Sequence, residues 1–128
     1  MATDPLRGEA EIELGGKKYP LKLTLPAVQQ MEIEASSSWQ ALINGAIAGE
    51  LRIDHIAAVL WGGMIGAGLE NPPSYSEVVA MVFDEGLIKT NPVVRDLMLL
   101  QAVGQKRAGE VAAMVEGMAA EVQDAVKV

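Results

Sequence analysis

Residues 55–73 read HIAAVLWGGMIGAGLENPP and contain a long uncharged run, from Ile56 to Leu69. This run has 14 residues, whereas a helix that crosses a bilayer needs about 20. The pair Pro72–Pro73 ends the stretch, because proline cannot continue a helix. Apolar side chains at helical spacing form one stripe along it: Ile53, Ile56, Ala57, Leu60, Met64 and Ala67. The pattern predicts the central core helix of a small domain and no membrane segment.

Two glycines four residues apart, Gly62 and Gly66, lie beside this stripe, and Trp61 lies on its flank. A glycine inside a helix costs about 1 kcal/mol relative to alanine. Its presence is understandable if another backbone must approach closely. That backbone could belong to this chain or to a partner, so Trp61, Gly62 and Gly66 are candidate partner-binding residues.

Residues 9–25 predict a β-hairpin. Apolar and polar residues alternate strictly on both sides of Gly15–Gly16, which is the signal of two strands joined by a two-residue turn. This turn sets the register and places Ile12 opposite Tyr19 and Glu13 opposite Lys18. Pro20 has no N–H to donate, so its strand should have one open side. Because an isolated hairpin is only marginally stable, its apolar face must pack on helices or on another chain.

Four further segments predict helices. The first starts near Pro26, the second runs from Trp39 to Ala48, and the third follows the capping-box pattern Ser74 to Glu77 and ends at Gly86. Its expected apolar face comprises Val78, Val79, Val82 and Phe83. Asn91–Pro92 predicts the start of the last helix. The predicted fold is therefore α+β and mostly helical: an N-terminal hairpin packed on a bundle of four to five helices.

We divide the chain into residues 1–90, a hairpin plus helical domain, and residues 91–128, a C-terminal helical segment. The second part carries Met98, Met114 and Met118 on apolar helical positions. Flexible thioethers adapt to irregular partners, so these methionines are candidate partner-binding residues of an arm. A terminal core helix explains them equally well.

The composition argues against several classes of function. The net charge is −7 and the sequence pI is about 4.6, which disfavours binding to nucleic-acid phosphates. There is no cysteine, and the single histidine, His55, follows Asp54 directly, so the two side chains point in different directions on a helix. We therefore predict no catalytic residues, no metal site and no cofactor.

The first residues lack the pattern of a signal peptide, so we expect a cytoplasmic protein.

Residues Leu6 to Gly86 carry three stretches, RGEAEIELGGKKYPLKLTLPAVQQMEIE, LRIDHIAAVLWGGMIGAG and YSEVVAMVFDEG. Together they resemble the small tail assembly chaperones of long-tailed phages, in the branch of gene transfer agents and prophages that is sometimes labelled tail tube protein. The resemblance implies a non-enzymatic protein that binds the tape-measure protein, the tail tube protein or both, and is absent from the finished particle.

The alternative is a structural component of the tail. Tube subunits are rich in strands, whereas this sequence predicts two strands and four or five helices. The open strand edge and the apolar helix faces also suggest a homo-oligomer.

Overall fold

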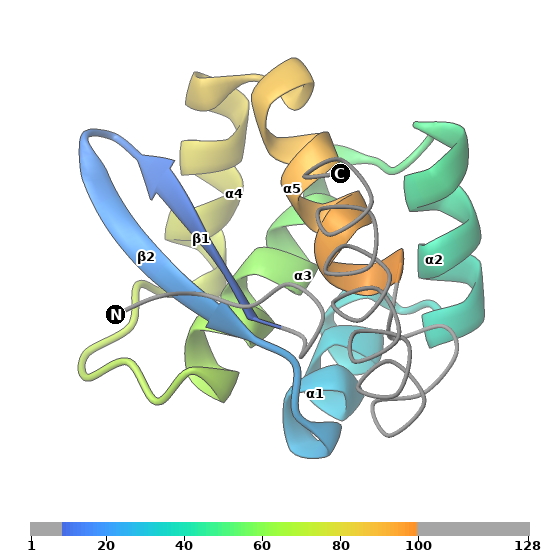
Figure 1. Ribbon diagram of the computed structural model, residues 1–128, viewed down its shortest axis with the longest axis horizontal. Coiled ribbons are helices and arrows are strands. Elements are labelled where there is room, and N and C mark those ends of the chain that lie inside the picture. Colours follow the sequence, from blue (N-terminus) through green and yellow to red (C-terminus); the bar gives the residue numbers. More distant parts are fainter. Residues whose placement is uncertain (1–8, 100–128) are drawn as a thin grey trace, which may run out of the picture.

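The computed structural model describes residues 9–99, which form one antiparallel hairpin followed by five helices (Figure 1). This confirms the predicted fold class, α+β and mostly helical. Figure 1 shows the hairpin across one side of the helices, with α3 at the centre. The elements are β1 (Glu9–Leu14), β2 (Lys17–Lys22), α1 (Leu25–Ala35), α2 (Trp39–Ala48), α3 (Ile53–Gly66), α4 (Tyr75–Glu85) and α5 (Leu87–Leu99).

The hairpin has the register that the alternating pattern predicts. Ile12 lies opposite Tyr19, and Glu13 lies opposite Lys18. Gly15 and Gly16 adopt φ values of 60° and 79°, the left-handed conformation that a two-residue turn of this kind requires and that glycine adopts without steric cost. The side chains of Ile12 and Tyr19 are buried, so one face of the hairpin packs on the helices.

Side-chain caps set the starts of three helices. The Thr24 Oγ1 accepts a hydrogen bond from the Ala27 N–H at 3.2 Å, and Ser38 Oγ accepts from the Ala41 N–H at 3.1 Å. The third cap is Ser74, whose Oγ accepts from Glu77 N–H. Each cap satisfies a backbone donor that the helix itself leaves unpaired. The helix starts predicted near Pro26, at Trp39 and after Ser74 are confirmed.

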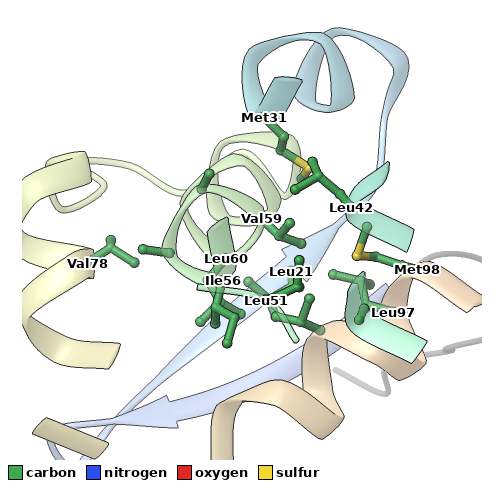
Figure 2. Packing of buried hydrophobic residues seen from close by; sticks show 14 of the residues in the cluster. Leu21, Met31, Leu42, Leu51, Ile56, Val59, Leu60, Val78, Leu97 and Met98 are labelled. Carbon is green, nitrogen blue, oxygen red and sulfur yellow. The ribbon is translucent and has the colours of Figure 1, made fainter. Parts of the chain in front are cut away.

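Helix α3 is buried on nearly all sides, which goes beyond the single stripe that its spacing predicts. Every residue from Ile56 to Leu60 is buried. Figure 2 shows the reason: Met31 of α1, Val78 of α4 and Leu97 of α5 surround α3. Because α3 carries no charged residue after His55, each of its sides can be covered without burying a charge.

No helix within residues 9–99 is long and apolar enough to cross a membrane.

Helix α5 begins at Leu87, so the start predicted at Asn91–Pro92 is wrong. Gly86 adopts a φ of 92°, which ends α4 and lets α5 start at the next residue. Pro92 then lies inside α5, where it cannot donate to the carbonyl of Ile88. Ile88 is 95% exposed, so water can solvate this region and the helix tolerates the proline. The predicted division between residues 90 and 91 falls within α5, and residues 100–128 lie outside the described part.

The glycines of α3 receive neighbouring segments of the same chain. A Cβ on Gly62 would overlap the Met31 side chain, and a Cβ on Gly66 would overlap the backbone carbonyl oxygen of Lys22. Met31 belongs to α1, and Lys22 is the last residue of β2. The missing side chains therefore allow α1 and the end of the hairpin to lie directly on α3.

We expect Gly66→Ala to lower the free energy of unfolding by about 2 kcal/mol, the range for overpacking a dense core. The overlap is with backbone, which cannot rotate away. Gly62→Ala should destabilise the protein as well, because its Cβ would overlap the Cγ of the buried Met31 side chain and lie 3.3 Å from the Ala27 carbonyl oxygen. Gly45→Ala is the control, because its Cβ would meet only the end of the Leu51 side chain, 2.7 Å away. Urea denaturation followed by circular dichroism measures all three. A Gly66→Ala protein as stable as Gly45→Ala would contradict this packing.

Candidate functional site

Within residues 9–99, the predicted partner-binding residues do not come together on one surface. Trp61 is half-buried and makes an edge-to-face contact with Tyr75, with ring centroids 6.0 Å apart. Gly62 and Gly66 face Met31 and the Lys22 carbonyl, inside the chain. Met98 is fully buried in the core. A partner could reach these glycines or Met98 only after the surrounding elements moved. Met114 and Met118 lie outside the described residues.

The described residues also contain no cluster of three or more His, Asp or Glu side chains that could hold a metal ion. His55 lines a shallow depression with Asn44, Glu50 and Leu51. None of these neighbours forms a hydrogen bond with the imidazole, so residues 9–99 show no arrangement of a base and a nucleophile around it.

Large apolar side chains are exposed where α4 meets α5. Phe83 is 70% exposed, Ile88 is 95% exposed, and Leu87 lies between them and is also exposed. We call these three residues the α4–α5 corner. Exposed apolar side chains that cluster in this way mark interaction sites more often than isolated ones do.

An apolar groove lies next to this corner, between α4 and the start of α3. It has a volume of about 620 Å³. Its lining comprises Arg52, Ile53, Asp54, Ser76, Val79, Ala80, Phe83 and Asp84. Phe83 therefore belongs both to the α4–α5 corner and to this α3–α4 groove, and the two form one continuous surface.

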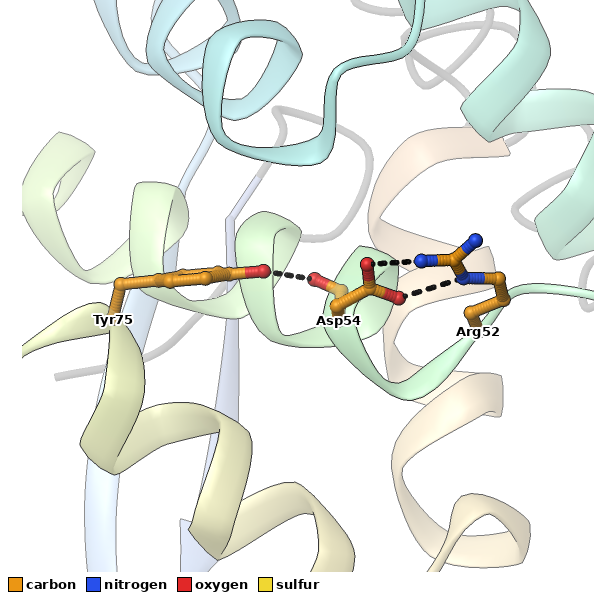
Figure 3. Close-up of polar contacts among 3 residues, drawn as sticks. All are labelled: Arg52, Asp54 and Tyr75. Atoms are coloured by element: carbon orange, nitrogen blue, oxygen red, sulfur yellow. Dashed lines mark hydrogen bonds and ion pairs between the residues drawn. The ribbon is translucent and has the colours of Figure 1, made fainter.

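One wall of the groove is held by a polar brace (Figure 3). The Arg52 guanidinium donates two hydrogen bonds to the Asp54 carboxylate, at 3.1 and 2.7 Å. The Tyr75 hydroxyl donates to the Asp54 backbone carbonyl at 2.9 Å. The bonds from Arg52 lower the pKa of Asp54, and burial raises the pKa of the Tyr75 hydroxyl. The hydrogen bond from Tyr75 ties the start of α4 to the start of α3 beside the groove.

The unpaired charge around the groove is acidic. Helix α4 contains Glu77, Asp84 and Glu85 and no lysine or arginine. Glu85 accepts hydrogen bonds from Lys89 Nζ at 2.7 Å and from the Gly15 N–H at 2.5 Å, and these bonds lower its pKa. Arg52 is occupied by Asp54. Asp84 makes no ion pair within residues 9–99, so a ligand of this surface meets apolar side chains flanked by a free carboxylate.

The predicted apolar face of α4 is wrong only at Phe83. Val78 and Val82 are buried and Val79 packs partly buried against the core, as expected, but Phe83 is exposed to solvent. Val78 and Val82 are four residues apart and share one side of the helix, whereas Phe83 lies about 100° further round. Sequence reasoning also missed the exposed residues Leu87 and Ile88, two adjacent apolar side chains that follow Asp84, Glu85 and Gly86 in the chain.

Residues 7–104 match the protein family described as "Phage tail tube protein, GTA-gp10". The match covers most of the 128-residue chain, so the protein belongs to this family. This confirms the expected relation to the tails of phages and gene transfer agents. The family description names a tube protein and not an assembly chaperone. No curated protein and no solved structure matches the chain.

We expect Arg52→Gln to raise the pKa of Asp54 toward its ordinary value, because the two charged donors are lost. The folded-state pKa of Asp54 lies below the value of about 3.9 for an unfolded aspartate. The interaction therefore stabilises the protein above that pH and is lost as the pH falls through the folded-state pKa.

An NMR titration of the Asp54 carboxyl carbon measures this change. Arg95→Gln is the control, because Arg95 pairs with Asp96 at 3.2 Å and should leave Asp54 unaffected. An unchanged titration of Asp54 in the Arg52→Gln protein would show that the Arg52–Asp54 ion pair of the brace does not form in solution.

Proposed function

We propose that this protein is a non-enzymatic tail assembly chaperone, which binds the tape-measure protein, the tail tube protein or both while a phage-like particle is assembled. The observation that carries the proposal is the exposed apolar surface made by the α4–α5 corner and the α3–α4 groove. The protein acts in the cytoplasm of the producing cell and is absent from the finished particle. Membership of a phage tail family supports a role in building the tail.

The size of this surface suits a transient complex. Burial of an exposed phenylalanine or isoleucine contributes about 2 kcal/mol each, and association consumes part of that energy. Phe83 and Ile88 are the most exposed large apolar side chains on this surface. A client held mainly by them can be released once it is incorporated into the tail.

The charge of the protein fits the same role. A net charge of −7 on 128 residues keeps a complex with an aggregation-prone client in solution, because like-charged complexes repel each other. Asp84 lies next to Phe83 and makes no ion pair within residues 9–99. It therefore places part of this charge at the edge of the proposed contact.

The second candidate is a structural component of the tail, and the description of the family as a tail tube protein favours it. Tube subunits are rich in strands and form rings. Residues 9–99 contain two strands, both in one hairpin, and this fold supports the chaperone more than the tube subunit.

We expect this protein to co-purify with the tape-measure or tail tube protein of its own gene cluster, and to keep that client soluble when the two are co-expressed. The double variant Phe83→Ser/Ile88→Ser should lose at least about tenfold in affinity, since 1.4 kcal/mol corresponds to a factor of ten. Its stability should be close to that of the wild type, because both side chains are exposed.

Ile47→Ser is the matched control. Ile47 is 57% exposed on α2, which Figure 1 shows on the other side of α5 from α4. If both variants bind equally well, the α4–α5 corner is not the docking surface. If neither client gains solubility and the protein is found in purified particles, the structural role replaces the chaperone role.

A further inference from the structure

The hairpin has two outer edges, and its register shows which backbone groups lie on each. The two-residue turn makes Leu14 and Lys17 a hydrogen-bonded pair. Hydrogen-bonded and non-hydrogen-bonded pairs then alternate along the strands. The backbone N–H and C=O groups of three residues on β1 and three on β2 therefore point away from the hairpin: Glu9, Glu11 and Glu13, and Lys18, Pro20 and Lys22.

The outer edge of β2 is closed in two ways. Pro20 is one of its outward-pointing residues and has no N–H, so it cannot pair with a further strand. The outward-pointing carbonyl of Lys22 lies against Gly66 of α3. Helix α3 and the proline together prevent another strand from pairing with β2.

The outer edge of β1 has no such protection. Glu9, Glu11 and Glu13 make no backbone hydrogen bond outside the hairpin within residues 9–99. Their side chains lie on the face away from the buried residues Ile12 and Leu14. An edge of this kind, with free donors and acceptors at every second residue, is a template for strand addition.

The charge on this edge selects the strand that can be added. Glu11 lies opposite Pro20, and its nearest cation is Lys18 Nζ, 4.0 Å away at the surface. Two β1 edges paired antiparallel would place glutamates opposite glutamates, and like charges directly opposite each other are destabilising. A second copy of this chain is therefore a poor occupant. A strand with lysine or arginine at alternate positions is a good one.

We propose that the outer edge of β1 binds an extended segment of a partner protein by strand addition, and that basic residues alternate with apolar ones in this segment. The basic side chains contact Glu9, Glu11 and Glu13, and the apolar ones face the helices below the hairpin. Strand β2 has the same pattern, with Lys18 and Lys22 on one face and Tyr19 and Leu21 on the other. The proposal concerns a different surface from the α4–α5 corner and does not depend on the chaperone function.

Amide hydrogen exchange on the full-length protein tests the proposal, with a synthetic heptapeptide of alternating lysine and valine as the probe. The N–H groups of Glu9, Glu11 and Glu13 should exchange about tenfold more slowly when the free peptide is at about ten times its dissociation constant. The N–H groups of Ala10, Ile12 and Leu14 are already paired with β2 and should change little. A peptide of alternating glutamate and valine should give no protection.

Two variants separate strand addition from a purely electrostatic contact. Glu11→Pro removes an outward N–H and leaves the hydrogen bonds between β1 and β2 intact. It should therefore abolish the protection of the Glu9 and Glu13 N–H groups by the basic peptide. Glu11→Lys keeps the N–H, and should weaken binding of the basic peptide and strengthen binding of the acidic one. Phe83→Ser is the control and should bind the basic peptide like the wild type.

Three results would overturn the inference. The first is fast exchange of the three glutamate amides at saturating peptide. The second is slow exchange in the free protein, which would mean that the chain itself covers the edge. The third is equal protection of neighbouring amides, which would indicate general stabilisation and not an added strand. If Phe83→Ser abolishes client binding but the basic peptide still protects the β1 amides, the chaperone function does not use the β1 edge.

Discussion

The close contact between Gly66 of α3 and the Lys22 carbonyl of β2 is the constraint on which the rest of the structure depends. A side chain at residue 66 would push the strand away from the helix. With glycine there, the end of the hairpin lies directly on the central helix, and the buried side chains of Leu21 and Leu23 reach the core. A two-stranded hairpin has little stability of its own, so this contact decides whether the hairpin belongs to the domain.

The other end of the hairpin is attached by polar contacts. Glu85 of α4 accepts a hydrogen bond from the Gly15 N–H in the turn, and the Tyr19 hydroxyl lies 3.9 Å from the sulfur of Met81. The hairpin is therefore held at its open end by α3 and at its turn by α4. Because β2 carries Pro20 and lies on α3, β1 is the one strand within residues 9–99 whose outer edge has free backbone groups. The same packing that stabilises the hairpin thus determines which edge a partner can use.

The surfaces that we connect with function consist of side chains and backbone groups that the core packing leaves exposed. Helix α4 uses Val78 and Val82 for the core, and exposes Phe83 in a groove that Arg52 and Asp54 of the brace also line. Both this surface and the β1 edge combine apolar or backbone binding groups with acidic side chains. This combination suits a protein of a phage tail family that contacts other proteins of the tail during assembly.

The sequence by itself determined the local elements, because their signals lie within a few residues. Gly15–Gly16 and the alternation around it predicted the strand register, and the structure confirms the helix starts predicted at Trp39 and after Ser74. Only the tertiary structure decided which neighbours the α3 glycines receive, and that Met98 is buried and Phe83 exposed. These outcomes depend on residues far apart in the chain. A hydrophobic pattern predicts that one side of a helix can be buried. Which residues cover that side depends on how the other helices pack against it.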